Sequence, residues 1–146
     1  MPYLSYVQNL IRARGLEDVV KIVPETDQVW TYLRAADVFV CTSYVEAFSL
    51  SVLEAEAFGL PIVSTPCGGL DEQVVWGRNA LRFEFGNAEE LARHMQSLIQ
   101  NPQLRAEMGR QSRAAFELSQ SPREMLNQYE HAIQKAATTP RARHVA

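Results

Sequence analysis

The sequence has few cysteines and no long hydrophobic run. Its two cysteines, Cys41 and Cys67, do not form a CxxC pair, and two thiols cannot complete a zinc site alone. Each closes an apolar run, which is typical of a reduced, partly buried thiol. No apolar stretch approaches the ~20 residues of a membrane span. Residues 1–6 lack the basic region and apolar core of a signal peptide. We therefore predict a cytoplasmic protein with no membrane span.

The sequence also lacks an excess of positive charge. Its formal net charge is -3 and its basic residues are scattered, with only Arg141–His144 coming close to a cluster. Because non-specific binding of nucleic acid requires a basic face, we expect no nucleic-acid partner. The 146 residues suffice for one domain with a sizeable core, and no internal repeat or low-complexity linker divides them.

Short β-branched runs alternate with segments of helical spacing. Strands are expected at 19–23, 37–41, 61–65 and 81–85, and helices at 3–14, 27–35, 49–58, 71–75, 88–100, 103–118 and 122–137. Strands that alternate with helices form a parallel sheet with right-handed crossovers. We predict an α/β fold in residues 1–137: an incomplete, doubly wound, Rossmann-like sheet of about four parallel strands with a helical C-terminal extension. Residues 138–146 are predicted to be a frayed tail.

The predicted sheet indicates where a ligand would bind. In open parallel sheets, ligands bind beyond the carboxyl ends of the strands. In this sequence those ends lead into residues 24–26, 42–48 and 66–70. Any site should therefore be built from these three loops.

Two carboxylates flank a predicted helix start in the second of these loops. Glu46 follows a buried strand, Glu54 lies in the first turns of the next helix, and seven residues separate them. The free N–H groups at the start of this helix, together with its dipole, suit a phosphate. The carboxylates on either side could accept hydrogen bonds from sugar and ribose hydroxyls. This arrangement fits a nucleotide sugar.

A purely structural interpretation of the same residues is also open. Ser51 and Glu54 fit the S-x-x-E capping box, in which Glu54 only closes the end of its own helix. Glu46 would then be a solvated loop residue. On spacing alone, this structural interpretation is favoured.

A longer series of motifs resembles the family 4 glycosyltransferases, which are retaining enzymes with the GT-B fold. The series begins with Asp37–Val40 and an E-x7-E region, and it continues through Glu54–Val63, Gly68–Val75, Gly77–Leu81, Asn87–Ala92 and Asn101–Gly109. It covers about residues 3–130 and resembles the C-terminal, nucleotide-sugar-binding half of that fold.

This resemblance implies roles for the site residues. Glu46 would be the catalytic residue that contacts the donor sugar, and Glu54 would hold the ribose hydroxyls. The residues between them would bind the sugar and the diphosphate through their backbone: Ala47, Phe48, Ser49, Leu50 and Ser51. No metal and no cofactor are expected, because a helix N-terminus and basic residues replace the metal in this architecture.

The resemblance also bears on two neighbouring loops. Residues 24–26 would lie near the nucleobase. Gly68 and Gly69 match the paired glycines of the family, which either allow close backbone packing or form a plain turn.

The sequence departs from the family pattern at three positions. The family usually has glycine where this chain has Ala47 and Ser49, and a β-carbon there could narrow the pocket or misplace an N–H group. The family usually has an apolar residue at the position of Glu56. A buried Glu56 would be costly unless it is paired.

Judged by this resemblance, three parts of the family's fold are expected to be absent from this chain: a strand and loop that carry an Arg–Lys pair, a second strand with a glycine-rich turn, and the acceptor domain. We therefore expect little or no turnover by this chain alone. We also expect either a protein partner that supplies the acceptor half or self-association through an exposed hydrophobic edge. The alternative function is a non-catalytic nucleotide-sugar-binding module, either a pseudoenzyme or the remnant of a split transferase.

Overall fold

The computed structural model describes residues 2–119 and 122–138. The chain is an α/β protein, as predicted. Its elements in chain order are α1 (Pro2–Ala13), α2 (Val29–Ala35), β1 (Phe39–Cys41), α3 (Leu50–Ala57), β2 (Ile62–Ser64), α4 (Leu70–Gln73), β3 (Ala80–Arg82), α5 (Ala88–Gln100), α6 (Pro102–Ser119) and α7 (Pro122–Thr138). Apart from Thr138, the predicted tail lies outside the described residues.

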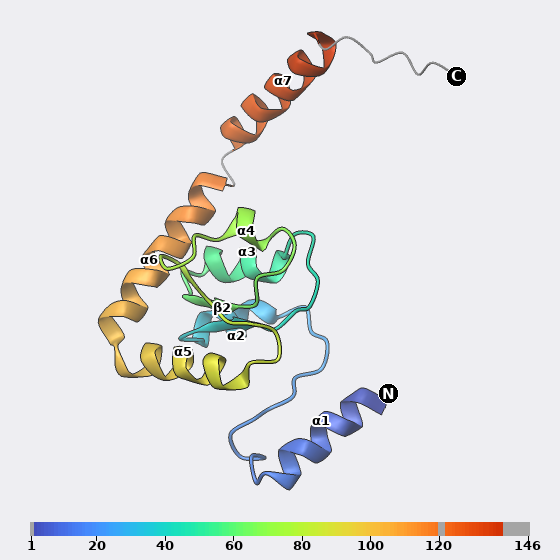
Figure 1. Ribbon diagram of the computed structural model, residues 1–146, viewed down its shortest axis with the longest axis vertical. Coiled ribbons are helices and arrows are strands. Elements are labelled where there is room, and N and C mark those ends of the chain that lie inside the picture. The colour runs from blue at the N-terminus through green and yellow to red at the C-terminus, as the bar shows by residue number, and fades with distance from the viewer. Residues whose placement is uncertain (1, 120–121, 139–146) are drawn as a thin grey trace.

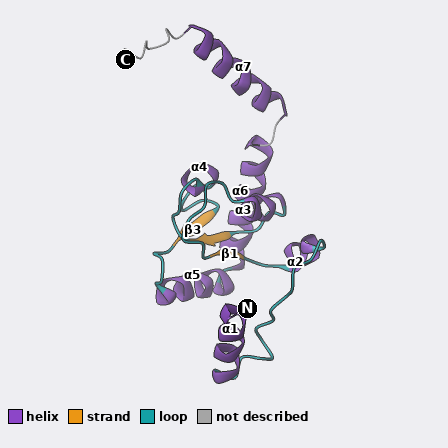
Figure 2. Ribbon diagram, turned by 90° about the vertical axis from the view of Figure 1, so that its right-hand side faces the viewer, coloured by secondary structure: helices purple, strands orange, loops and turns teal. Residues whose placement is uncertain are grey.

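The three strands form a parallel sheet in the order β1-β2-β3. Ile62 and Val63 of the central strand are fully buried and point to opposite faces. Ile62 packs in a cluster with Val52 and Ala55 of α3, whereas Val63 packs with Leu98 of α5. Figures 1 and 2 show the same layering, with α3 and α4 on one side of the sheet and α5 on the other. Helices covering both faces explain why consecutive residues of each strand, such as Ile62 and Val63, are apolar.

The end of α3 packs closely on α6. Gly59 follows the helix with φ +67, a left-handed conformation that glycine adopts without strain. A Cβ atom on Gly109 would lie 2.3 Å from the Gly59 carbonyl oxygen, so glycine is required on α6 at this contact. Ser112 Oγ donates a hydrogen bond of 2.6 Å to the Leu60 carbonyl beside it. Residues far apart in the sequence thereby fix the direction in which α3 runs.

The predicted strand at 19–23 is wrong. These residues belong to no strand: Val19 lies in a turn, in which the Val19 and Val20 N–H groups donate to the Leu16 carbonyl, and Val19 is 74% exposed. A β-strand is stabilised by hydrogen bonds to a neighbouring strand, and no described strand lies beside this segment. Figure 1 shows α1 and the following loop standing apart from the sheet. The sheet consequently has three described strands rather than about four.

The remaining differences lie at element ends. Gln28, rather than Asp27, precedes the first turn of α2, and Thr26 Oγ1 accepts a hydrogen bond from the Gln28 N–H. β1 lies at an edge of the sheet in the described residues.

None of the helices in the described ranges combines the length and hydrophobicity that crossing a lipid bilayer requires.

Candidate functional site

Two of the three predicted loops meet at the carboxyl edge of the sheet. The loop at 42–49 follows β1 and the loop at 65–69 follows β2, and these strands are hydrogen-bonded neighbours. Residues 24–26 follow no strand, so the sheet does not place them at this edge. The candidate site is therefore formed by the β1–α3 and β2–α4 loops and the start of α3.

Paired glycines bring these two loops into direct backbone contact. A Cβ atom on Gly68, which has φ +52, would lie 1.6 Å from the Glu46 carbonyl oxygen. A Cβ atom on Gly69 would lie 1.8 Å from the Ala47 carbonyl oxygen. The Gly69 N–H donates a hydrogen bond of 3.0 Å to the Glu46 carbonyl. Close packing, rather than a plain turn, is thus the role of this pair.

The backbone of Ser49 is held by a side chain from α4. The Ser49 N–H donates to Gln73 Oε1 at 2.7 Å, and Gln73 Nε2 donates to the Ser49 carbonyl at 3.0 Å. The Gln73 side-chain amide thereby binds both the N–H and the carbonyl of Ser49. Sequence analysis missed Gln73, because its 24-residue separation from Ser49 leaves no local pattern.

Glu46 is positioned by its own loop. Ser43 Oγ donates a hydrogen bond of 2.7 Å to Glu46 Oε1, and the Ser43 carbonyl accepts one of 2.6 Å from Thr65 Oγ1 in the neighbouring loop. Glu46 is half-buried. Ser43 was also missed by sequence analysis, although its position three residues before Glu46 in a polar loop was the available signal.

Glu54 lies on the exposed face of α3. Leu50, Ser51 and Glu54 are exposed, while Val52 is fully buried. Positions four apart share one face of a helix, and side chains tilt toward its N-terminus. Leu50 and Glu54 are four apart, so the Glu54 carboxylate points toward the helix start. Within the described residues this carboxylate makes no hydrogen bond or ion pair.

The predicted capping box does not form. The helix begins at Leu50, its N-cap residue is Ser49, and that side chain makes no capping hydrogen bond. Ser51 therefore lies inside the helix, where it cannot act as the N-cap partner of Glu54. The structural interpretation of Glu54 loses its main support.

The helix start offers fewer N–H donors than the sequence suggested. The Ser49 N–H is already bonded to Gln73, whereas Leu50 and Ser51 are in the first turn, where N–H groups have no intrahelical acceptor. Ser49 has φ -93, and no residue other than glycine has positive φ in the described segments. The chain thus adopts this loop without glycine at positions 47 and 49. Phe48, beside Ser49, is 50% exposed.

Glu56 is buried and paired, as its departure from the family pattern requires. It is 1% exposed, and Asn79 Nδ2 donates a hydrogen bond of 2.9 Å to its Oε1. Asn79 Oδ1 in turn accepts from the Val75 N–H at 2.7 Å. Burial raises the pKa of Glu56 to about 7, against the opposing effect of the Asn79 hydrogen bond.

A cavity of about 290 Å³ opens at the same edge of the sheet. Thr42, Thr65 and Phe85 are among the residues that line it, whereas Glu46 and Glu54 are not. Among the described residues, no three His, Cys, Asp or Glu side chains gather as a metal site would require. A reaction without metal stays a prediction.

Comparison with known proteins identifies the family. The family model described as "Glycosyl transferases group 1" matches residues 1–115. This chain belongs to the group 1 glycosyltransferases. An uncharacterized glycosyltransferase of Haemophilus influenzae is 36% identical over 76% of this chain and 32% of the relative. A D-inositol 3-phosphate glycosyltransferase of Arthrobacter is 38% identical over 71% of this chain and 25% of the relative. The chain therefore spans between a quarter and a third of these family members' length.

Solved structures place the fold in the C-terminal half of GT-B transferases. HepE of Anabaena in complex with UDP has a TM-score of 0.84 and 24% identity, over 92% of this chain and 37% of HepE. Sucrose-phosphate synthase of Thermosynechococcus elongatus has a TM-score of 0.78 and 26% identity, over 91% of this chain and 34% of the synthase. The group 1 chain thus has the predicted fold class.

We expect Gly69→Ala to destabilise the protein by about 1–3 kcal/mol, because the new Cβ must displace the Ala47 carbonyl. Gly69 has φ -76, which alanine adopts freely, so the cost comes from the contact alone. Urea denaturation measures the free energy of unfolding. Gly15→Ala is the control, with φ +62 and no atom within 4 Å, and should cost about 1 kcal/mol through backbone strain. Wild-type stability in Gly69→Ala would show that the loops are not in contact.

Glu56 predicts a pH-dependent stability. Its pKa is about 7 in the folded chain against an ordinary 4.5, so between these values the folded state keeps a proton that the unfolded state releases. The contribution of Glu56 to the free energy of unfolding should be fully present below pH 4.5 and should be lost, by up to about 3 kcal/mol, as pH rises from 4.5 to 7. Glu56→Gln cannot ionise and should lose this fall, whereas the exposed Glu89→Gln should keep it. Identical pH profiles for Glu56→Gln and wild type, by urea denaturation, would contradict the assignment.

Proposed function

We propose that this chain is the donor-binding half of a retaining glycosyltransferase, which transfers a sugar from a nucleotide-diphosphate sugar to an acceptor held by another part of the enzyme. The observation that carries this proposal is the arrangement around α3. Glu46 is fixed before the helix, Glu54 is unpaired on its exposed face, and first-turn N–H groups lie between them. Family membership and the UDP and UDP-glucose complexes of HepE support the same ligand class.

The two carboxylates have different surroundings, and this favours different roles. Glu46 has one oxygen held by Ser43, which suits a group that must keep a fixed direction toward a sugar hydroxyl. Glu54 has both oxygens available, as accepting two ribose hydroxyls requires. We assign the sugar to Glu46 and the ribose to Glu54. These assignments correspond to the first and last residues of the E-x7-E motif of family 4.

The diphosphate would lie at the start of α3. Leu50 and Ser51 would donate their N–H groups, with Ala47 and Phe48 contributing backbone from the preceding loop. Ser49 would act indirectly, because its N–H is held by Gln73 and its bound backbone shapes the loop. Fixed donors of this kind stabilise charge that develops on a leaving group, without a metal.

The acceptor half is proposed to come from elsewhere. The chain spans about a third or less of its relatives. The resemblance to the donor-binding half implies that the acceptor binds a part of the transferase outside this span. A separate protein partner or a second copy could supply it. The proposed cytoplasmic location is inferred from the sequence alone.

Calorimetry on two variants tests the assigned roles. Glu54→Ala should weaken binding of UDP by about tenfold or more, because a hydrogen bond to a charged group is worth roughly 1.5–3 kcal/mol. Glu46→Ala should leave UDP binding unchanged, since UDP carries no sugar, and should weaken binding of UDP-glucose. A thermal-shift panel of nucleotide sugars first confirms or replaces this donor.

Glu89→Ala is the matched control for this experiment, since Glu89 is an exposed carboxylate on α5. It should change neither affinity. If Glu46→Ala and Glu54→Ala behave identically toward UDP and UDP-glucose, the division of roles is wrong. If neither variant differs from wild type toward the donor selected by the panel, the site itself is wrong.

A further inference from the structure

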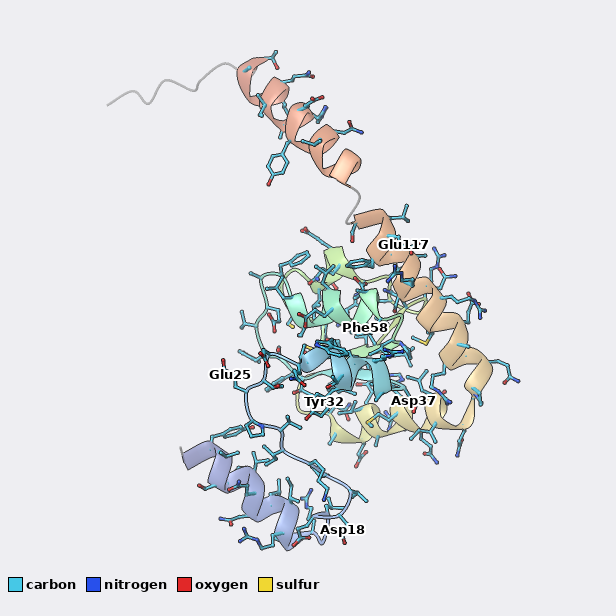
Figure 3. All side chains as sticks on the ribbon, turned by 180° about the vertical axis from the view of Figure 1, so that it is seen from behind. Asp18, Glu25, Tyr32, Asp37, Phe58 and Glu117 are labelled. Atoms are coloured by element: carbon cyan, nitrogen blue, oxygen red, sulfur yellow. The ribbon has the colours of Figure 1, made fainter. Side chains whose placement is uncertain are left out.

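A second concave surface lies at the opposite end of the sheet from the candidate site. Asp37 comes just before β1 and Pro61 just before β2, and both line a cavity of about 560 Å³. The cavity is bounded by the end of α2, the end of α3 and one side of α6. In Figure 3, Asp37 and Phe58 lie between α2 and α6 on this side of the molecule. Glu46 and Glu54 do not line it.

Four arginines gather in this cavity, which we call the arginine cavity. Arg34 comes from α2, and Arg105, Arg110 and Arg113 come from α6, whereas Asp37 is its one acidic lining residue. The whole chain has a net charge of -3. Asp37, Glu107 and Glu117 each pair with one of these arginines, so the cavity keeps an excess of positive charge at Arg34, which has no acidic partner among the described residues.

Two of these arginines are fixed by the backbone of neighbouring helices. Arg105 Nη1 donates to the Leu98 carbonyl at 2.7 Å, and its Nε lies 3.6 Å from Asp37 Oδ1. Arg113 Nη1 donates to the Ala57 carbonyl at 2.5 Å, and its Nε donates to Glu117 Oε1 at 2.8 Å. Their positive charges are thus held in place before any ligand arrives, so a ligand need not order them.

The other two arginines are free to turn toward a ligand. Arg110 is 68% exposed and pairs with Glu107 of its own helix, an exposed ion pair that is weak in water. Arg34 is exposed and makes no hydrogen bond or ion pair among the described residues. Arg34 and Arg110 therefore have donors available to a bound anion.

The chemistry of this cavity matches a phosphate group. Guanidinium groups bind phosphate through two parallel N–H donors, and they do so with more geometric selectivity than lysine. The volume falls in the range of small-molecule sites. Phe58, 42% exposed on the rim, offers an apolar surface to the organic part of a phosphate ester. We propose that the arginine cavity is a second anion site, separate from the donor site, that binds a phosphate group, either free or as a phosphate ester.

NMR titration of the full chain with inorganic phosphate and with glucose 1-phosphate tests this proposal, at constant sodium chloride. Both probes should shift the amide signals of residues that line the cavity, such as Asp37, Gly59 and Ala106. Stronger binding of glucose 1-phosphate would identify an ester as the ligand, and equal binding would identify the phosphate alone. Glucose, which lacks the phosphate, should shift none of these signals.

Paired substitutions show whether the arginines carry the binding. Arg34→Gln with Arg110→Gln should weaken phosphate binding by about tenfold or more, since each arginine contributes a charge-assisted hydrogen bond. Arg12→Gln with Arg93→Gln removes the same charge from exposed positions outside the cavity and should leave the affinity unchanged. Glu54→Ala should also leave it unchanged, which separates this site from the donor site.

Three results would overturn the proposal. They are the absence of shifts in wild-type protein at millimolar phosphate, equal weakening by the two arginine pairs, and shifts confined to the start of α3. Binding of UDP by the Arg34→Gln, Arg110→Gln variant verifies that this variant is folded and that its donor site is independent.

Discussion

The contact on which the candidate site depends is the close approach of two backbone segments at the carboxyl edge of the sheet. The two loops follow neighbouring parallel strands. Because Gly68 and Gly69 have no Cβ atom, the backbones of the two loops can pack in direct contact. The carbonyls of Glu46 and Ala47 are thereby fixed against the β2–α4 loop. Gln73 then holds Ser49 at the point where α3 begins. The position of one glutamate and the start of one helix thus follow from a contact between glycines and carbonyls.

In this site, the groups that the protein holds in place are not the groups that are available to a ligand. Glu46 and Ser49 are bonded within the protein, while Glu54 and the first-turn N–H groups of α3 are not. A site built in this way presents ligand-binding groups from a frame that does not have to reorganise. The buried Glu56 belongs to the frame, because its bond to Asn79 ties α3 to the turn before β3. A glutamate in the core is thus compatible with the fold, because the Asn79 side-chain amide donates a hydrogen bond to it.

Local sequence signals were sufficient for most of the fold. Strands such as Ile62–Ser64 are apolar runs bounded by helix-ending Gly59 and by Pro66, and the helices after Ala88 are separated by Pro102 and Pro122. The strand predicted at 19–23 failed, because β-branched residues form a strand only where another strand is available to pair with. For the site, the sequence pointed to Glu46 and Glu54 through spacing and resemblance. It did not show that Gln73 occupies the Ser49 N–H, since that contact arises only from the tertiary packing of α4.

A crystal structure of the chain bound to UDP-glucose, or to the donor that a thermal-shift panel selects, would show whether the donor binds at the start of α3. We expect the ribose at Glu54, the sugar at Glu46 and the diphosphate at the N–H groups of Leu50 and Ser51. Gln73 should still hold both backbone groups of Ser49, and Gly68 and Gly69 should still touch the Glu46–Ala47 backbone. A ligand bound away from the start of α3, or a Gln73 side chain displaced so that the Ser49 N–H binds the diphosphate, would contradict it.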